Sequence, residues 1–193
     1  MPADVRELTR DAVRARLAEA VFGHFVTVGF DASTVEEAAT AAGISRATFF
    51  RYFRSKEDAV IAALPPNPAG FAGLLRSLDT RRDEPTWTLM RRVFEASVDG
   101  EADPERVRAK ARLITGIPSL RAHLAERRAA QEHLLAEAIG ERVDDPLTAR
   151  VLAATSLAAF DLAWREWAAT PDASFRTVIR AVFSRVSDSV AGV

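Results

Sequence analysis

The sequence predicts an all-α protein with two parts, a three-helix helix-turn-helix module in residues 1–60 and a larger helical domain in residues 61–193. Apolar residues recur at helical spacing along most of the chain. No segment alternates apolar and polar residues over a length that predicts a strand. With 193 residues, of which 48% are apolar, the chain is long enough to bury a core in both parts.

The first expected helix runs from about Leu8 to Val28 and ends at Gly29. Its apolar face consists of Leu17, Val21, Phe25 and Val28. We expect this helix to form the third wall of the N-terminal module.

The segment Thr34–Lys56, TVEEAATAAGISRATFFRYFRSK, predicts two short helices joined by a glycine turn. Thr34 and Glu37 have the spacing of a capping box at the start of the first of these helices. Gly43 lies at the turn, where a left-handed backbone costs glycine nothing. Ser45 is placed to cap the second helix. This order of elements is typical of a helix-turn-helix whose second helix reads DNA.

The second of these helices has two chemically different faces. Phe49 and Phe53 are four residues apart and share one side, so we expect that side to pack against the module. Ala47, Thr48 and Arg51 project from the other side. This second side is therefore free to contact a partner.

Positive charge is concentrated at this helix. Residues 45–56 contain no acid and four cations, which are Arg46, Arg51, Arg54 and Lys56. The formal net charge of the whole chain is −1, so the positive charge is local. Helix pairs with a glycine turn also occur in other all-helical proteins, and a charged face is often only a solvated one. These residues alone leave both interpretations open.

The segment GFDASTVEEAATAAGISRATFFRYFRSKED at residues 29–58 closely resembles the signature of the tetracycline-repressor (TetR) family. The resemblance is dense over residues 14–60 and implies a DNA-binding module followed by a ligand-binding and dimerisation domain. It matches Thr34 and Lys56 to phosphate contacts. It matches the front of the recognition helix, which meets base edges and nearby phosphates, to Ser45, Arg46, Ala47 and Thr48.

Two positions depart from the pattern of the family. Phe50 stands where tyrosine is most frequent, and Tyr52 stands where histidine is most frequent. Because Phe50 cannot donate a hydrogen bond, we expect it to pack at the helix edge or to touch a sugar or thymine methyl. We expect the Tyr52 hydroxyl to bind a phosphate oxygen instead. With Arg51, these residues complete the predicted DNA contacts.

The helical pattern continues to the end of the chain. The fourth helix is expected from about Ser55 to Leu64, because the prolines at 65, 66 and 68 cannot continue it. Prolines at 85, 104, 118 and 146 suit the starts of later helices. Those helices are expected at about 69–79, 85–99, 103–116, 119–140, 146–169 and 173–190.

The last two expected helices, within residues 146–190, indicate how the protein assembles. Residues 151–164, VLAATSLAAFDLAW, are apolar on nearly every side, and the last helix carries a broad apolar stripe. In the TetR family the final two helices pair with their symmetry mates, so we expect a homodimer through them. Close approach would be permitted by Ala153, Ala154, Ala158 and Ala159. A monomeric bundle edge is the alternative.

Apolar residues of the larger domain are candidates for an effector pocket between helices. They are Trp87, Met90, Phe94, Leu113, Phe160 and Trp164. At helical spacing such residues are more often core than pocket. Asp161 needs a partner within its apolar helix, whether Arg112, Arg165, a ligand cation or the other subunit.

The segment from Arg112 to Arg128, RLITGIPSLRAHLAERR, together with AFDLAWREW, is similar to a branch of the family that includes regulators of mycofactocin genes. This resemblance suggests a fatty acyl thioester as the effector. Cations for its phosphates would come from Arg108, Arg112, Arg121, Arg127 and Arg128.

Several classes of function lack support in the sequence. Without cysteine there are no disulfides and no thiolate metal sites, and no motif suggests a cofactor or metal. The three histidines are scattered and accompany no nucleophile or phosphate-loop motif, so an enzyme is not predicted. We find no leader and no apolar run long enough to span a bilayer, and we expect a cytoplasmic protein with no membrane partner.

We therefore expect a ligand-responsive transcriptional regulator. In this hypothesis a homodimeric repressor binds a palindromic operator in double-stranded DNA and is released by a small, largely apolar effector. The alternative is a helical ligand-binding protein that has lost DNA binding, which is suggested by Phe50 and by the absence of net positive charge in residues 1–60 as a whole. The four cations within residues 45–56 argue against that loss, as do Arg6, Arg10, Arg14 and Arg16.

Overall fold

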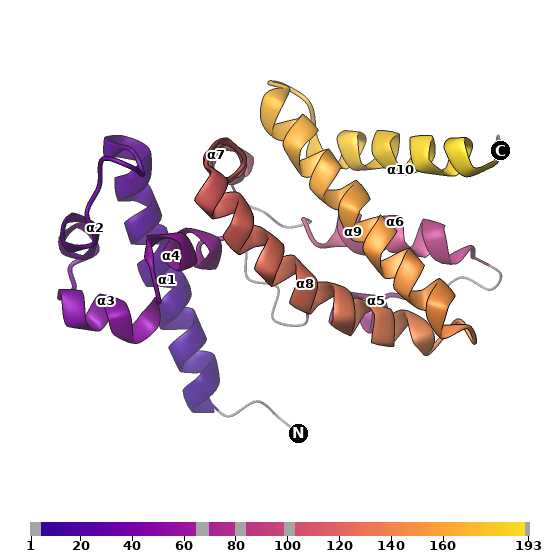
Figure 1. Ribbon diagram of the computed structural model, residues 1–193, viewed down its shortest axis with the longest axis horizontal. Helices are drawn as coiled ribbons and strands as arrows, with labels where there is room; N and C mark the ends of the chain where they lie inside the picture. The colour runs from indigo at the N-terminus through magenta and orange to yellow at the C-terminus, as the bar shows by residue number, and fades with distance from the viewer. Residues whose placement is uncertain (1–4, 65–69, 80–83, 99–102, 192–193) are drawn as a thin grey trace. The chain divides into compact units, whose positions relative to one another are not determined.

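The computed structural model describes residues 5–64, 70–79, 84–98 and 103–191, and these residues form ten α-helices and no strand (Figure 1). The helices are α1 Val5–Val28, α2 Val35–Ala41, α3 Arg46–Tyr52, α4 Lys56–Ala62, α5 Gly70–Ser77, α6 Thr86–Ala96, α7 Pro104–Gly116, α8 Pro118–Gly140, α9 Pro146–Ala169 and α10 Phe175–Ala191. The all-α prediction is confirmed. The prolines expected to end the fourth helix lie outside the described residues.

Local capping hydrogen bonds explain where the short N-terminal helices begin. The Thr34 Oγ1 atom accepts from the backbone N–H of Glu37 at 3.2 Å, and Glu37 Oε2 accepts from the backbone N–H of Thr34 at 2.8 Å. This is the predicted capping box of α2. Ser45 Oγ accepts from the backbone N–H of Thr48 at 3.1 Å and caps α3. Gly43 has a φ of 71°, the left-handed conformation that the turn requires.

Proline and aspartate mark the starts of the later helices. Pro104, Pro118 and Pro146 are the first residues of α7, α8 and α9, where the missing N–H costs nothing. Asp145 accepts hydrogen bonds from two backbone N–H groups in the first turn of α9. Pro85 is instead the N-cap residue of α6, which therefore begins one residue later than predicted.

The first compact unit consists of α1–α4 together with Leu113–Leu124, the end of α7 and the start of α8. Within it, α1 packs against α2 and α4, and α2 packs against α3. The largest core side chains are at most 1% exposed and are Phe22, Phe25, Phe49 and Phe53. The rings of Phe49 and Phe53 lie 5.1 Å apart. One face of α3 is thereby fixed in the core, as predicted, and its opposite face is directed outward.

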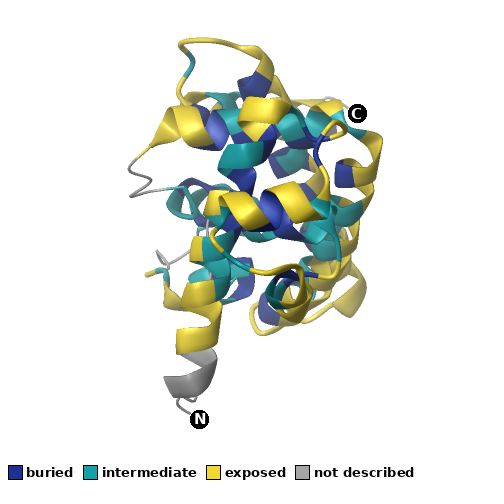
Figure 2. Ribbon diagram, turned by 90° about the vertical axis from the view of Figure 1, so that its left-hand side faces the viewer, coloured by how far each residue is buried: buried dark blue, intermediate teal, exposed yellow. Residues whose placement is uncertain are grey.

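The second compact unit contains α5, α6, α9 and α10, with α7 up to Arg112 and α8 from Ala125. Helix α10 packs along α9 and α6, and α6 also packs against α5 and α9. The buried positions, dark blue in Figure 2, recur along the helices. A continuous set of ring contacts runs through this core and joins Phe71, Phe94, Phe160, Trp164, Trp167 and Phe175.

Helix α9 is the one helix among the described residues whose length and composition would fit a lipid bilayer. Its mean hydropathy reaches 1.2 over an 18-residue window, so the prediction that no such run exists was wrong. Of that window, 44% is buried inside the protein, and α9 packs against α10 and α6. Burial of one side of α9 in the core of the second unit accounts for part of its apolar character.

Candidate nucleic-acid interface

The outward face of α3 carries most of the side chains predicted to contact DNA. Arg46, Ala47 and Arg51 are exposed, and Phe50 is 43% exposed. The guanidinium of Arg46 lies over the Phe50 ring, 5.0 Å from its centroid. Thr48 is half-buried beneath this face. The structure thus places the predicted base-reading residues together on one side of a helix whose other side is anchored in the core.

Arg46 has an acidic partner that the sequence did not predict. Its Nε atom lies 2.5 Å from Oε1 of Glu36 on α2, and both side chains are more than 60% exposed. An ion pair this exposed is weak, because water and salt screen it. If Arg46 reads a base with its Nε–H, it must first leave this carboxylate.

The two predicted phosphate contacts already have partners inside the protein. The Thr34 hydroxyl donates to Glu37 Oε2 at 2.8 Å, and the backbone and side-chain hydrogen bonds from Thr34 lower the pKa of Glu37. The Lys56 ammonium donates to the carbonyls of Phe30 and Ser33, each at 2.9 Å. Two of its three N–H donors therefore hold the loop between α1 and α2. The phosphate roles of Thr34 and Lys56 stay predictions.

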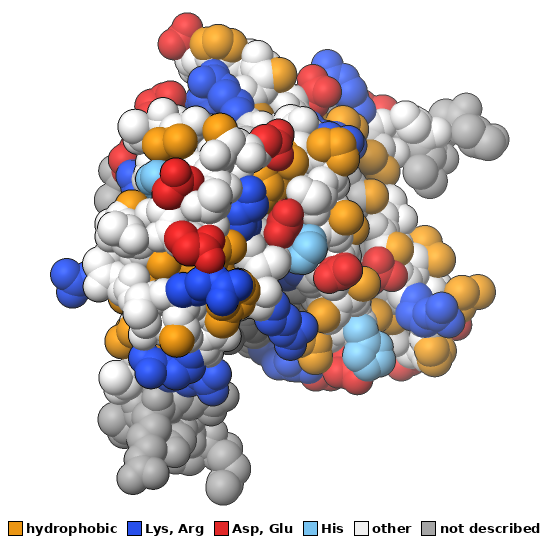
Figure 3. Space-filling model, turned by 60° about the vertical axis from the view of Figure 1, so that its left-hand side comes forward, with side chains coloured by type: hydrophobic (Ala, Val, Ile, Leu, Met, Phe, Trp, Pro, Cys, Tyr) orange, Lys and Arg blue, Asp and Glu red, His pale blue; other side chains and the backbone are white. Residues whose placement is uncertain are grey.

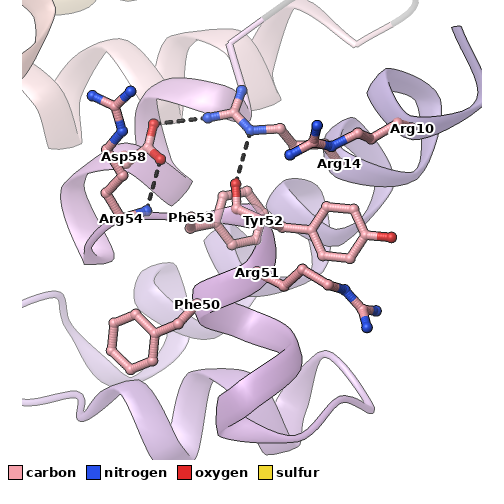
Figure 4. Close-up of a pocket in the computed structure, with 8 residues that line it drawn as sticks. All are labelled: Arg10, Arg14, Phe50, Arg51, Tyr52, Phe53, Arg54 and Asp58. Atoms are coloured by element: carbon pink, nitrogen blue, oxygen red, sulfur yellow. Dashed lines mark hydrogen bonds and ion pairs between the residues drawn. The ribbon is translucent and has the colours of Figure 1, made fainter. Parts of the chain in front are cut away.

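A hollow of about 450 Å³ lies beside the C-terminal end of α3 (Figure 4). It is lined by Arg10 and Arg14 of α1, by Phe50, Arg51 and Tyr52 of α3, and by Phe53, Arg54 and Asp58. Tyr52 and Arg51 were predicted as DNA contacts. The two α1 arginines were not assigned to a DNA contact, because only folding brings α1 beside this end of α3.

Arg14 holds the walls of this hollow in place. Its Nε–H donates to the backbone carbonyl of Tyr52 at 3.1 Å, and its Nη2 atom lies 2.7 Å from Asp58 Oδ1. The other carboxylate oxygen of Asp58 accepts from the backbone N–H of Arg54 at 2.9 Å. One guanidinium thus connects α1 to the last residue of α3 and to α4. This contact fixes the orientation of α3 relative to α1 and α4.

Charge is distributed unevenly over the protein surface. On the face shown in Figure 3, Lys and Arg side chains form separate groups with carboxylates among them. This agrees with a formal net charge of −1. Binding to a polyanion must therefore depend on particular groups of cations and not on a general positive field.

The residues predicted to line an effector pocket are largely packed against one another. Four are buried in the second unit, namely Met90, Phe94, Phe160 and Trp164. The rings of Phe94 and Phe160 stack with centroids 4.8 Å apart. Trp87 is half-buried and donates to the Phe183 carbonyl at 3.1 Å. Leu113 belongs to the first compact unit. Core packing accounts for these contacts, and a pocket role stays a prediction.

Asp161 pairs with Arg128 of α8, at 2.8 Å, and not with Arg112 or Arg165 as the sequence suggested. The Arg128 guanidinium also lies 4.9 Å from the centroid of the Phe160 ring. Burial lowers the pKa of Arg128, and the charge and hydrogen bond of Asp161 oppose that shift. The carboxylate is therefore the counter-ion of a partly buried arginine.

Two arginines suggested as phosphate ligands instead hold the C-terminal end of α9. Arg108 is buried, lies 4.3 Å from the Trp167 ring centroid, and donates to the carbonyls of Trp167, Thr170 and Ala173. The Nε–H of Arg112 donates to the Ala168 carbonyl at 2.9 Å. Carbonyls at a helix C-terminus lack intrahelical partners and carry partial negative charge. The phosphate roles suggested for both arginines stay predictions.

Comparison with known proteins agrees with this arrangement. Residues 18–63 match the profile of bacterial regulatory proteins of the tetR family, and residues 84–191 match the MftR C-terminal domain. The second match alone covers more than half of the chain. The chain belongs to the TetR family. It is therefore a DNA-binding transcriptional regulator, and the TetR family is not a family of enzymes.

Individual TetR-family relatives match over most of the chain. The HTH-type transcriptional regulator TcmR of Streptomyces glaucescens is 30% identical over 177 residues, which cover 84% of this chain and 75% of TcmR. A candidate mycofactocin biosynthesis regulator, MftR of Mycobacterium tuberculosis, is 27% identical over 168 residues, 84% of this chain and 83% of MftR.

Solved structures of TetR-family regulators share the fold. One from Mesorhizobium loti has a TM-score of 0.51 at 17% identity and covers 97% of this chain and 98% of its own. One from Streptomyces coelicolor has a TM-score of 0.52 at 18% identity and covers 95% and 96%. At these identities the likeness concerns the fold alone.

Proposed function

We propose that this regulator is a homodimeric repressor that binds a palindromic operator and is released by a small, largely apolar effector. The observation that carries the proposal is the exposed face of α3, held outward by the buried Phe49 and Phe53. A helix fits the major groove, and an arginine such as Arg46 can read a guanine bidentately. The methyl groups of Ala47 and Thr48 suit a thymine methyl. Such a protein acts in the cytoplasm, where bacterial DNA lies.

The dimer is proposed through α9 and α10. On α9 an outward apolar stripe at helical spacing is formed by Leu147, Val151, Ala154, Ala158 and Leu162. Leu147 is 64% exposed in the single chain, and a second copy would remove this surface from water. Ala153 and Ala159, which the sequence suggested for the interface, are buried inside the subunit. The stripe is therefore narrower than the sequence indicated.

Two-fold symmetry of the dimer has a consequence for the DNA. The two α3 helices would enter major grooves about 34–36 Å apart or at a multiple of this distance, so the operator would be palindromic. Effector binding would favour a separation of the two helices that no longer matches the grooves, with α4 as the connecting element. The aromatic core of the second unit favours an apolar effector. In a narrower form of this proposal the effector is a fatty acyl thioester, although Arg108 and Arg112, two of its suggested phosphate ligands, already donate to backbone carbonyls.

Electrophoretic mobility shift with DNA from beside the gene of this protein tests the operator proposal. The parent should bind one fragment much more tightly than random DNA, and Arg46→Ala should reduce that preference by about 1–3 kcal/mol per base read. The control is Arg106→Ala, because Arg106 is an exposed arginine of α7, outside α3 and outside the proposed dimer helices. A parent that binds random DNA as tightly as every fragment from the locus would contradict the proposal.

Sedimentation equilibrium tests the dimer. Ala158→Arg places a charge in the centre of the α9 stripe and should shift the protein to monomers and weaken operator binding with it. The matched control is Ala122→Arg, because Ala122 is an exposed alanine of α8 that lies outside the stripe. A dimer that persists in Ala158→Arg would place the interface elsewhere.

A further inference from the structure

The hollow beside the C-terminal end of α3 carries an unbalanced positive charge. Four of its lining residues are arginines and one is an acid, Asp58. Asp58 already forms an ion pair with Arg14, with 2.7 Å between Asp58 Oδ1 and Arg14 Nη2. Arg10, Arg51 and Arg54 are all exposed, and among the described residues no carboxylate pairs with their guanidinium groups. Three cations therefore line one open space without an acidic partner among the residues that the structure describes.

The shape of the hollow is fixed by other contacts. The bridge from Arg14 to the Tyr52 carbonyl and to Asp58 sets the spacing between α1 and the end of α3. The Arg14 guanidinium also lies 5.5 Å from the centroid of the Phe53 ring, and Phe53 is buried. Figure 4 shows the Tyr52 hydroxyl pointing away from this bridge. The hollow thus offers planar guanidinium groups and one hydroxyl donor, which suit a phosphate.

The position of the hollow indicates which phosphate it would meet. From Arg46 to Tyr52, α3 advances roughly 9 Å, at about 1.5 Å per residue. The major groove of B-DNA is about 12 Å wide. When the first residues of α3 contact base edges, its last residue therefore lies near the groove wall, where the phosphates run.

Resting on the proposed role of α3 as the recognition helix, we propose that this hollow binds a backbone phosphate of the operator at the edge of the major groove. Arg10 and Arg54 are the additional phosphate ligands, beside Arg51 and the Tyr52 hydroxyl. The Arg10 contact comes from α1, so it would fix the angle of the whole module on the duplex and not only the position of α3. These contacts would carry no sequence information, because phosphates are the same at every base pair.

The test measures the affinity of full-length Arg10→Ala and Arg54→Ala for operator and for random DNA over a range of salt concentrations. If each arginine neutralises one phosphate, the slope of log K against log salt falls by about 0.9 per subunit, or about 1.8 for a dimer. The corresponding loss at about 0.15 M salt is roughly fivefold per contact. Both DNA types should lose the same factor. Arg16→Ala is the matched control, because Arg16 is an exposed arginine of α1 that does not line the hollow.

Free phosphate compounds are the other source of the same chemistry, and pyrophosphate is the probe for them. Calorimetric titration at constant ionic strength compares its binding by the parent and by Arg10→Ala. Unchanged salt slopes in both variants, with pyrophosphate bound only by the parent, would assign the hollow to a free phosphate compound and overturn the operator assignment. Unchanged slopes without pyrophosphate binding would overturn the site altogether. A parent protein that binds operator and random DNA equally well would contradict the proposed function. It would not by itself contradict the phosphate site, because the salt dependence on random DNA tests that site separately.

Discussion

The exposed ion pair between Arg46 and Glu36 predicts that removal of an acid strengthens DNA binding. Arg46 Nε lies 2.5 Å from Glu36 Oε1 in the free protein. If Arg46 reads a base with its Nε–H, this pair breaks when the operator binds, and the cost of breaking it opposes binding. Glu36→Gln removes the charge and keeps the length of the side chain, so we expect higher operator affinity.

The size of the effect follows from the exposure of the pair. The side chains of Arg46 and Glu36 are 63% and 61% exposed, so the pair belongs to the class worth about 0.2–1 kcal/mol. Its loss should raise affinity by about 1.4-fold to fivefold per subunit, or roughly twofold to thirtyfold for a dimer. Glu36 also lies in the first turn of α2, where an acid interacts favourably with the helix dipole. Glu36→Gln should therefore cost about 0.3–1 kcal/mol of stability.

The assay combines operator binding by fluorescence anisotropy with thermal unfolding. The two measurements should move in opposite directions, with tighter binding and a slightly lower melting temperature. Glu141→Gln is the matched control, because Glu141 forms a similarly exposed ion pair with Arg76 at 2.6 Å in the second compact unit. It should leave operator affinity unchanged. Weaker operator binding by Glu36→Gln would refute the reasoning and show that Glu36 holds Arg46 in its reading position.

Three further predictions concern the recognition helix and stability. Tyr52→Phe should weaken operator binding about threefold to tenfold per subunit without lowering the melting temperature, and Phe50→Tyr should leave affinity unchanged or raise it; normal binding with a lower melting temperature would make Tyr52 a core residue. Thr34→Ala should cost about 1 kcal/mol in urea unfolding, because α2 loses its cap, and an unchanged midpoint would contradict this. Burial acts to raise the pKa of Glu95, but the hydrogen bond from Arg180 and nearby guanidinium charge outweigh it and hold that pKa below 4.5. Ionised Glu95 therefore stabilises the folded protein above pH 4.5, and this contribution is lost as pH falls through the lower pKa of Glu95 in the folded state. Glu95→Gln should lower the free energy of unfolding by about 1–3 kcal/mol at pH 7 and make that free energy less dependent on pH in the acidic range. If the free energy of unfolding of parent and variant falls in parallel with pH, the role given to Glu95 is wrong.

Helix positions and the anchored face of α3 were accessible from the sequence because they depend on local contacts. The capping box at Thr34, the cap at Ser45 and the turn at Gly43 involve residues no more than three apart in the chain. Phe49 and Phe53 share a face by helical spacing alone. Such patterns need no knowledge of which helix packs against which.

The partners of charged side chains were accessible only from the tertiary structure. The chain contains 24 arginines that could pair with Asp161, and the one that does, Arg128, is 33 residues away in sequence. The bridge from Arg14 to Asp58 spans 44 residues and creates the hollow beside α3. Ala153 and Ala154 are neighbours in sequence, yet only Ala153 is fully buried.

The sequence by itself determined the all-α class, the order of the helices and the family, because capping, periodicity and a dense motif are properties of short segments. Tertiary structure decided which cations stay available for a phosphate and which are used inside the protein. Lys56 donates to two loop carbonyls, and Arg10, which the sequence did not assign to a DNA contact, lines an open hollow. The physical reason is that a long charged side chain pairs with the polar groups that lie near it, and the packing of segments distant in sequence determines which groups these are.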